Sequence, residues 1–165
     1  MPLISIVVPC YNEQESLPIF LKELDGVVRI MTQQDPEISF EAVLIDDGSA
    51  DKTLAVMKAE AAAAHPYAIR WHSFSRNFGK EAALLAGLQH AKGDYVATMD
   101  ADMQDPPSLL PQMYEILQTE NYDNVATRRT TREGEPSHQV VLCPYVLQDH
   151  QPHFKGRHRR RSTRF

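Results

Sequence analysis

Short apolar runs alternate along this chain with longer segments whose apolar residues recur at helical spacing. The runs at residues 3–8, 41–45, 69–74 and 95–99 predict strands, because each has the length of a strand and is bounded by polar residues, proline or glycine. Between the first two runs, the apolar residues fall on one face of a helix, as expected for a helix that packs on a sheet. This face consists of Leu17, Phe20, Leu21, Leu24, Val27, Val28 and Met31.

The same alternation continues to about residue 127. An alanine-rich segment that ends near residue 64 predicts a second helix, and the stripe at residues 109–117 predicts a fourth. Pro111 requires the fourth helix to begin late or to bend, since proline has no N–H to donate. Residues 125–127 predict a fifth strand. The third helix is predicted from an apolar face made of Leu84, Leu85, Leu88 and Ala91.

This order of elements predicts an α/β fold with a mostly parallel sheet and flanking helices. Trp71 and Tyr95 lie within predicted strands and are expected in the core. In parallel sheets, ligands bind beyond the carboxyl ends of the strands. The polar clusters of this chain follow the predicted strands, so they predict a ligand site at that edge of the sheet. They are residues 11–13, 46–47, 76–80, 100–104 and 128.

The acidic cluster after the fourth strand suggests a metal site. Asp100 and Asp102 are two residues apart, so in extended chain their carboxylates point the same way. Two like charges at such a short distance repel each other unless a cation or a proton lies between them. Carboxylate oxygens favour Mg²⁺ or Mn²⁺, which take their remaining ligands from water and from a substrate phosphate. Taken alone, the same pattern fits an acidic turn before a helix equally well.

Composition narrows the class of protein. A length of 165 residues suits one domain. No apolar run approaches the roughly 18 residues that a membrane span needs, and no signal-peptide pattern opens the chain. Cys10 and Cys143 have neither a metal-binding spacing nor a partner set for a disulfide framework, which predicts a cytoplasmic location.

The charge changes sign near residue 136. Residues 1–136 carry 11 basic and 21 acidic side chains, whereas residues 137–165 carry 6 basic and 1 acidic side chain and four of the seven histidines. The basic residues of the tail show no helical period, so no nucleic-acid partner is expected. A tail that binds nucleic acid or anionic lipid is the alternative.

Four motifs in order resemble those of a known family. They are residues 6–13 (IVVPCYNE), 45–49 (IDDGS), 76–79 (RNFG) and 99–107 (MDADMQDPP). Together they resemble the inverting family 2 glycosyltransferases, and within that family the polyprenyl-phosphate branch that includes dolichyl-phosphate mannosyltransferase. The resemblance covers about residues 3–136. It implies a GT-A fold, a Rossmann-like arrangement that binds nucleotide-diphosphate sugars.

The resemblance also implies roles for individual residues. Asp46 and Asp47 would recognise the base of the nucleotide, Asp100 would meet the ribose or the metal, and Asp102 and Gln104 would coordinate Mg²⁺ or Mn²⁺. The full set expected to bind the nucleotide sugar is Pro9, Tyr11, Asn12, Glu13, Asp46, Asp47, Lys80, Asp100, Ala101 and Arg128. Purely structural roles remain open for three of them, namely helix capping by Asn12, turn formation by Asp47 and a solvated helix start at Lys80.

The activity implied is transfer of a sugar from a UDP- or GDP-sugar to an acceptor, as in cell-wall or glycolipid biosynthesis. A divalent metal would lie on the donor diphosphate, and the acceptor would be a polyprenyl phosphate at the cytoplasmic face of the membrane. Family members carry the general base, an aspartate, well downstream of the Asp-x-Asp motif. Nothing after Pro136 matches that segment, so no catalytic base is assigned.

The mismatch after Pro136 leads to a hypothesis about the last 29 residues. Residues 1–136 are expected to form the donor-binding part of the domain, with the fold incomplete at its C-terminus. Residues 137–165 are expected to be a poorly ordered tail that arose from a frameshift. A fragment of this kind could bind nucleotide sugars without catalysis, and unpaired sheet edges could let it form a homo-oligomer. A receiver-like signalling domain is the remaining alternative, although receivers carry their acidic pair after the first strand.

Overall fold

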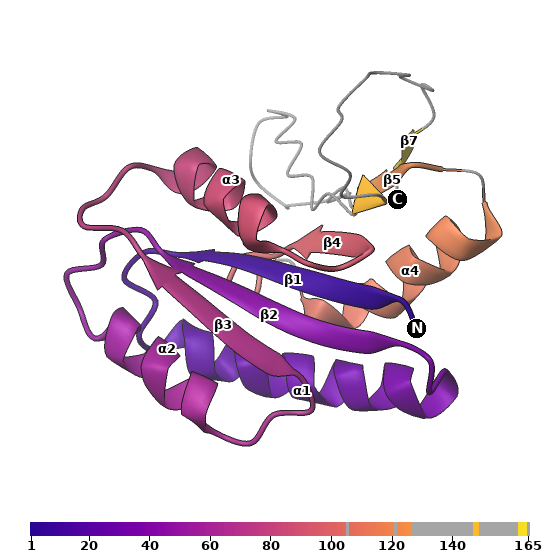
Figure 1. Ribbon diagram of the computed structural model, residues 1–165, viewed down its shortest axis with the longest axis horizontal. Coiled ribbons are helices and arrows are strands. Elements are labelled where there is room, and N and C mark those ends of the chain that lie inside the picture. Colours follow the sequence, from indigo (N-terminus) through magenta and orange to yellow (C-terminus); the bar gives the residue numbers. More distant parts are fainter. Residues whose placement is uncertain (105, 121, 127–146, 149–161, 165) are drawn as a thin grey trace, which may run out of the picture.

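A central sheet covered by helices on both faces forms the body of the molecule (Figure 1). The computed structural model describes residues 1–104, 106–120, 122–126, 147–148 and 162–164. In spatial order the sheet contains β3 (Ala68–Ser73), β2 (Ser39–Asp46), β1 (Leu3–Cys10), β4 (Tyr95–Thr98) and β6 (Leu147–Gln148). β6 pairs antiparallel with β4, and all other neighbours are parallel. The predicted α/β fold with a mostly parallel sheet is therefore confirmed.

The helices divide between the two faces of the sheet. Figure 1 shows α3 (Lys80–His90) on one face and α1 (Ser16–Gln34) with α2 (Thr53–Ala62) on the other. α4 (Leu110–Thr119) packs against α1 and follows a short 3₁₀ turn, η1 (Pro107–Leu109). Within the described part of the chain, no helix combines the length and the apolar character that crossing a bilayer requires.

Successive side chains of a strand point to opposite faces of the sheet, so the core has two layers. Ile4, Ile6 and Val8 of β1 point into the layer filled by α1, whereas Val7 points into the layer beneath α3. The predicted stripe of α1 is buried on the sheet, and only Val27 of that stripe is partly exposed. The helical periodicity of residues 17–31 therefore correctly predicted the buried face of α1, whereas the division of the core into two layers comes from the structure.

Helix α3 lies unusually close to β1 because of one glycine. A Cβ atom added to Gly87 would lie 2.2 Å from Val7 Cγ1 and 3.4 Å from Ile45 Cγ1. Any larger residue would push α3 away from the sheet, since a carbon–carbon contact at 2.2 Å is far inside the optimal separation. The first residue of α3 is Lys80, so this close packing also helps to fix where Lys80 lies.

Three local predictions can now be compared with the structure. The late start predicted at Pro111 is confirmed, because η1 precedes α4 and places Pro111 in the first turn of α4. The expected burial is right for Tyr95 and wrong for Trp71, which is 37% exposed. Trp71 lies on β3, a strand at the edge of the sheet, and the Lys58 ammonium lies 5.1 Å from its ring centroid.

The fifth strand is present, but it belongs to a second sheet. β5 (Asn124–Ala126) pairs in parallel with β7 (Ser162–Arg164), so the strand that extends the central sheet beyond β4 is β6 instead. The hydrophobic pattern does not predict β6 or β7. Two- and three-residue strands are too short for a period of two to be recognised.

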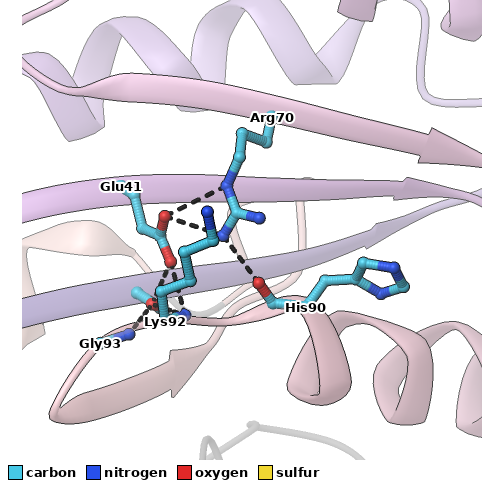
Figure 2. A network of polar contacts seen from close by, with 6 residues as sticks. Glu41, Arg70, His90, Lys92 and Gly93 are labelled. Atoms are coloured by element: carbon cyan, nitrogen blue, oxygen red, sulfur yellow. Dashed lines mark hydrogen bonds and ion pairs between the residues drawn. The ribbon is translucent and has the colours of Figure 1, made fainter.

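A buried carboxylate joins the strands near their amino ends, at the edge of the sheet opposite to the polar clusters (Figure 2). Glu41 accepts hydrogen bonds from the Ser5 hydroxyl at 2.6 Å and the Lys92 N–H at 2.8 Å, and it forms an ion pair with Arg70 at 2.8 Å. Burial alone raises the pKa of Glu41, but the hydrogen bonds from Ser5, Lys92 and Arg70 outweigh it and hold this pKa below its ordinary value. Glu41 is therefore a charged structural anchor.

Candidate functional site

A cleft of about 230 Å³ opens at the carboxyl ends of β1, β2 and β4, next to the start of α3. It brings together eight residues predicted for the site: Pro9, Tyr11, Glu13, Asp47, Lys80, Asp100, Ala101 and Asp102. Four further residues line it that were not predicted as site residues: Cys10, Asn77, Gly79 and Ala83. Cys10 and Gly79 lie directly beside a predicted residue and Asn77 lies within the 76–79 motif, so the motifs were the available signal for these three, whereas nothing in the sequence indicated Ala83.

The loop after β1 forms one wall of the cleft and is tied to the segment after β2. Asn12 has a positive φ of 58°, its N–H donates to Ser49 Oγ at 3.0 Å, and its Oδ1 accepts from the Ala50 N–H at 2.9 Å. The Glu13 N–H donates to Thr53 Oγ1 at 2.7 Å. Asn12 is not among the residues that line the cleft, and its side chain helps to hold two loops together.

The two adjacent aspartates at the carboxyl end of β2 are both buried, and they contact different partners. Asp46 accepts from the Ser49 N–H at 3.0 Å and from Ser73 Oγ at 2.7 Å, and it does not line the cleft. Asp47 lines the cleft and accepts from the N–H groups of Phe78 at 2.7 Å and Gly79 at 3.0 Å. Asp47 thus holds the loop that leads into α3.

Gly48 makes this contact between the two loops possible. Its φ is +67°, and a Cβ added there would lie 2.3 Å from the carbonyl carbon of Arg76 and 2.5 Å from the Asn77 nitrogen. Only glycine offers both that backbone conformation and that space. The glycine of the 45–49 motif is therefore needed because a loop about 28 residues further along the chain presses against it.

The acidic cluster lies at the floor of the cleft, directly after β4. Asp100 is 22% exposed, and its Oδ2 forms an ion pair with Lys80 Nζ at 2.6 Å. The exposed Asp102 accepts the Gln104 N–H at 2.9 Å, in a turn where Met103 has a φ of +61°. Gln104 lies outside the cleft lining, so the structure brings Asp100 and Asp102 to the cleft without the third predicted ligand.

The donor set at this place suits a hard divalent cation. Asp100 and Asp102 offer carboxylate oxygens, the ligands that Mg²⁺ and Mn²⁺ prefer. Among the described residues, no group of three or more His, Cys, Asp or Glu side chains is placed to hold a metal ion by itself. A cation here would complete its coordination with water and phosphate oxygens, as Mg²⁺ commonly does. Arg128, predicted to bind the diphosphate, lies outside the described residues.

The charges of the cleft are strongly unbalanced. Its described lining carries the carboxylates of Glu13, Asp47, Asp100 and Asp102 and the single ammonium group of Lys80. An anionic ligand such as a diphosphate would be repelled by this excess unless a cation accompanied it. Burial, together with the charges of Glu13, Asp46 and Asp100, raises the pKa of the Cys10 thiol, so Cys10 is a protonated wall residue and no nucleophile.

Comparison with known sequences identifies the family. The model of the family described as Glycosyl transferase family 2 matches residues 5–163. The undecaprenyl-phosphate 4-deoxy-4-formamido-L-arabinose transferase of Sodalis glossinidius (strain morsitans) is 39% identical over 132 residues, which are 79% of this chain and 38% of the relative. The protein of the same name from Klebsiella pneumoniae (strain 342) gives the same identity and coverage. The chain thus spans 38% of the length of these curated relatives.

Comparison with solved structures gives the same fold. TarS 1-349 of S. aureus in complex with UDP matches with a TM-score of 0.62 at 22% identity, over 82% of this chain and 38% of the TarS chain. The mannosyltransferase PcManGT from Pyrobaculum calidifontis, in complex with GDP-Man and Mn²⁺, matches with a TM-score of 0.61 at 24% identity, over 78% of this chain and 36% of that chain. These neighbours confirm the predicted GT-A fold. Because the family model spans most of the sequence, the chain belongs to glycosyl transferase family 2.

Proposed function

We propose that this chain forms the donor-binding part of a glycosyltransferase that transfers a sugar from a UDP- or GDP-sugar to a polyprenyl phosphate. The observation that carries this proposal is that Asp100 and Asp102 line the same cleft as the loop after β1 and Asp47. Family 2 membership supports the reaction class. The names of the curated relatives support a polyprenyl-phosphate acceptor, and the ligands of the structural neighbours support a UDP or GDP donor with Mn²⁺.

The proposed roles follow the positions of the side chains. Asp100 and Asp102, with Gln104 close by, would hold Mg²⁺ or Mn²⁺ against the diphosphate, and Arg128 would also meet the diphosphate. Six other predicted residues that line the cleft would contact the nucleotide sugar: Pro9, Tyr11, Glu13, Asp47, Lys80 and Ala101. Asn12 and Asp46 would act indirectly, because their side chains hold the loops that form the cleft.

The chemistry of sugar transfer explains why these groups are needed. Cleavage of the bond between sugar and diphosphate builds negative charge on the leaving group. A bound divalent cation supplies charge stabilisation for that leaving group. Asp100 and Asp102 bring two negative charges to the place where the cation is needed, and Lys80 adds one positive charge at the same wall of the cleft. Asp47 keeps that wall in place through the N–H groups of Phe78 and Gly79.

Assignments beyond the cleft are part of the same proposal. Residues 1–136 would be the donor-binding part, and residues 137–165 a separate basic tail. The reaction would take place at the cytoplasmic face of the membrane, where a lipid phosphate is accessible. Nucleic acid is not expected as a partner. Self-association through the open edge of β3 stays a prediction.

A nucleotide-sugar binder without catalysis is the second candidate, and one observation favours it. None of the four carboxylates in the described cleft lining is assigned as a general base: Asp100 and Asp102 are proposed metal ligands, Asp47 holds the loop before α3, and Glu13 is proposed to contact the nucleotide sugar. An inverting transfer needs a general base that can accept the proton of the acceptor. A receiver-like signalling domain is not supported, because the chain belongs to another family and its acidic pairs come at the ends of β2 and β4, whereas receivers carry theirs after the first strand.

Calorimetric titration with UDP- and GDP-sugars, with and without Mn²⁺, tests the proposal. We expect Mn²⁺-dependent binding that weakens by about tenfold or more in Asp102→Ala, because a metal ligand is lost. Asp35→Ala is the matched control, since the Asp35 carboxylate accepts the Glu37 N–H in an equivalent turn far from the cleft. Equal affinity in chelator and in Mn²⁺ would remove the metal role. Turnover with polyprenyl phosphate would separate an enzyme from a silent binder.

A further inference from the structure

The contact between Lys80 and Asp100 joins two residues that the site uses. Lys80 Nζ lies 2.6 Å from Asp100 Oδ2, a distance typical of a strong charge-assisted hydrogen bond. The Lys80 side chain is 46% exposed and that of Asp100 is 22% exposed, so both groups remain accessible from the cleft. A lysine ammonium is a point charge on a flexible stem and can move to a second anionic partner nearby.

The backbone around Lys80 fixes where its side chain begins. Asp47 holds the N–H groups of Phe78 and Gly79, the two residues before Lys80. Gly79 has a φ of +97°, which turns the chain sharply into α3. Gly87 then lets α3 lie close against β1. The root of the Lys80 side chain is therefore held, whereas its four-carbon stem is partly exposed and has several rotatable bonds.

The ion pair has a consequence for cation binding. A divalent cation between Asp100 and Asp102 needs the Asp100 carboxylate, and Lys80 already neutralises one oxygen of that group. Two cations in contact with the same carboxylate repel each other, so Lys80 and the metal compete. A diphosphate removes this conflict, because its oxygens can accept a hydrogen bond from Lys80 while they coordinate the metal.

We propose that Lys80 is a positioning residue that makes the cleft select a metal–diphosphate complex over the free metal ion. Lys80 holds the Asp100 carboxylate and disfavours a lone divalent cation. When a cation arrives with a nucleoside diphosphate, the Lys80 ammonium turns from Asp100 to the phosphate oxygens, and Asp100 becomes a metal ligand. This inference rests on the proposed donor-binding function.

Two binding measurements on the chain of 165 residues test the inference. Free Mn²⁺ is titrated by electron paramagnetic resonance in the absence of nucleotide, and UDP and GDP are titrated by calorimetry in saturating Mn²⁺. For Lys80→Met we expect the affinity for Mn²⁺ alone to rise about two- to fivefold, the effect of removing a partly exposed ion pair. We expect the affinity for the nucleoside diphosphate to fall about tenfold, the effect of losing a charge-assisted hydrogen bond.

Two further variants separate a local effect from a general one. Lys80→Arg keeps the charge and should stay close to the wild type in both measurements. Lys92→Met removes the same charge at the opposite edge of the sheet, where only the Lys92 backbone N–H bonds to Glu41, and should change neither affinity. Circular dichroism shows whether each variant is folded.

The opposite signs of the two effects are what a merely structural lysine cannot produce. If the affinities of Lys80→Met for free Mn²⁺ and for the nucleoside diphosphate both fell, or both matched the wild type, the inference would be overturned. The proposed function would still stand in that case, provided that the wild type binds UDP or GDP with Mn²⁺. A wild-type chain that binds neither nucleotide in Mn²⁺ would overturn the proposed function, and the role of Lys80 with it.

Discussion

The turn at Gly48 offers the sharpest test of how the cleft is built. Gly48→Ala places a methyl group where the structure has the backbone of the loop at residues 76–79. The added Cβ would lie 2.3, 2.5 and 2.7 Å from three backbone atoms of Arg76 and Asn77. These atoms belong to the main chain, so the whole loop must move by roughly 1 Å to restore ordinary contact distances.

Two terms set the expected cost. Holding alanine in the left-handed region costs about 1–2 kcal/mol. Displacing the loop breaks a hydrogen bond between Asp47 and the N–H of Phe78 or Gly79, and a bond to a charged group is worth about 1.5–3 kcal/mol. Together they lower the free energy of unfolding by about 2.5–5 kcal/mol. Because Lys80 follows this loop, the affinity for UDP or GDP in Mn²⁺ should fall as well.

Urea denaturation followed by circular dichroism measures the first effect and calorimetry the second. Gly26→Ala is the matched control, because a Cβ added there, in the middle of α1, would meet no atom within 4 Å apart from its chain neighbours and the backbone of its own helix. Alanine is the better helix former, so this control should stabilise the protein by about 0.5–1 kcal/mol. If the two variants differed by less than about 1 kcal/mol, the steric account of the turn would be refuted.

Two further variants test the packing and the charge of the fold. Glu41→Gln should lower the free energy of unfolding by about 2 kcal/mol at pH 7, because it leaves the partly buried Arg70 without its anion. The pKa of Glu41 is lower in the folded than in the unfolded chain, so its stabilising effect is full above the ordinary pKa of a glutamate and is lost as pH falls through the lowered value. Urea unfolding from pH 7 to pH 3 should therefore show the free energies of unfolding of wild type and Glu41→Gln converging. A difference that stays constant over this range would contradict the prediction. Gly87→Ala should destabilise the protein by about 1–3 kcal/mol through overpacking against Val7. In a double-mutant cycle, adding Val7→Ala to the same chain should recover part of that loss. Purely additive losses of stability would show that no clash exists.

Local patterns were enough to predict most elements. The burial of the α1 stripe, the positions of β1 to β4 and the late start of α4 all follow from residues within one or two helical turns of each other. The convergence of Asp47 and Asp100 on one cleft followed from a general rule, because parallel strands bring their carboxyl ends to one edge. Trp71 was misplaced because its burial depends on the order of the strands, which puts β3 at the edge.

Partners of side chains could not be predicted in the same way. The Asp46–Asp47 pair looks uniform in sequence, yet Asp46 bonds to Ser49 and Ser73, and Asp47 bonds to a loop 31 residues away. Nothing near Lys80 in the sequence indicates that Asp100, 20 residues later, is its counter-ion. Such contacts depend on how the chain returns to the same edge of the sheet.

The sequence by itself determined the α/β class, the family and the identity of the acidic groups after β4, because periodicity and short motifs are properties of neighbouring residues. Only the tertiary structure decided which of these groups line the cleft, which serve to hold loops, and that a single lysine faces four carboxylates in its described lining. The physical reason is that burial and charge pairing depend on distances through space, and those distances are set when separate strands and helices pack together.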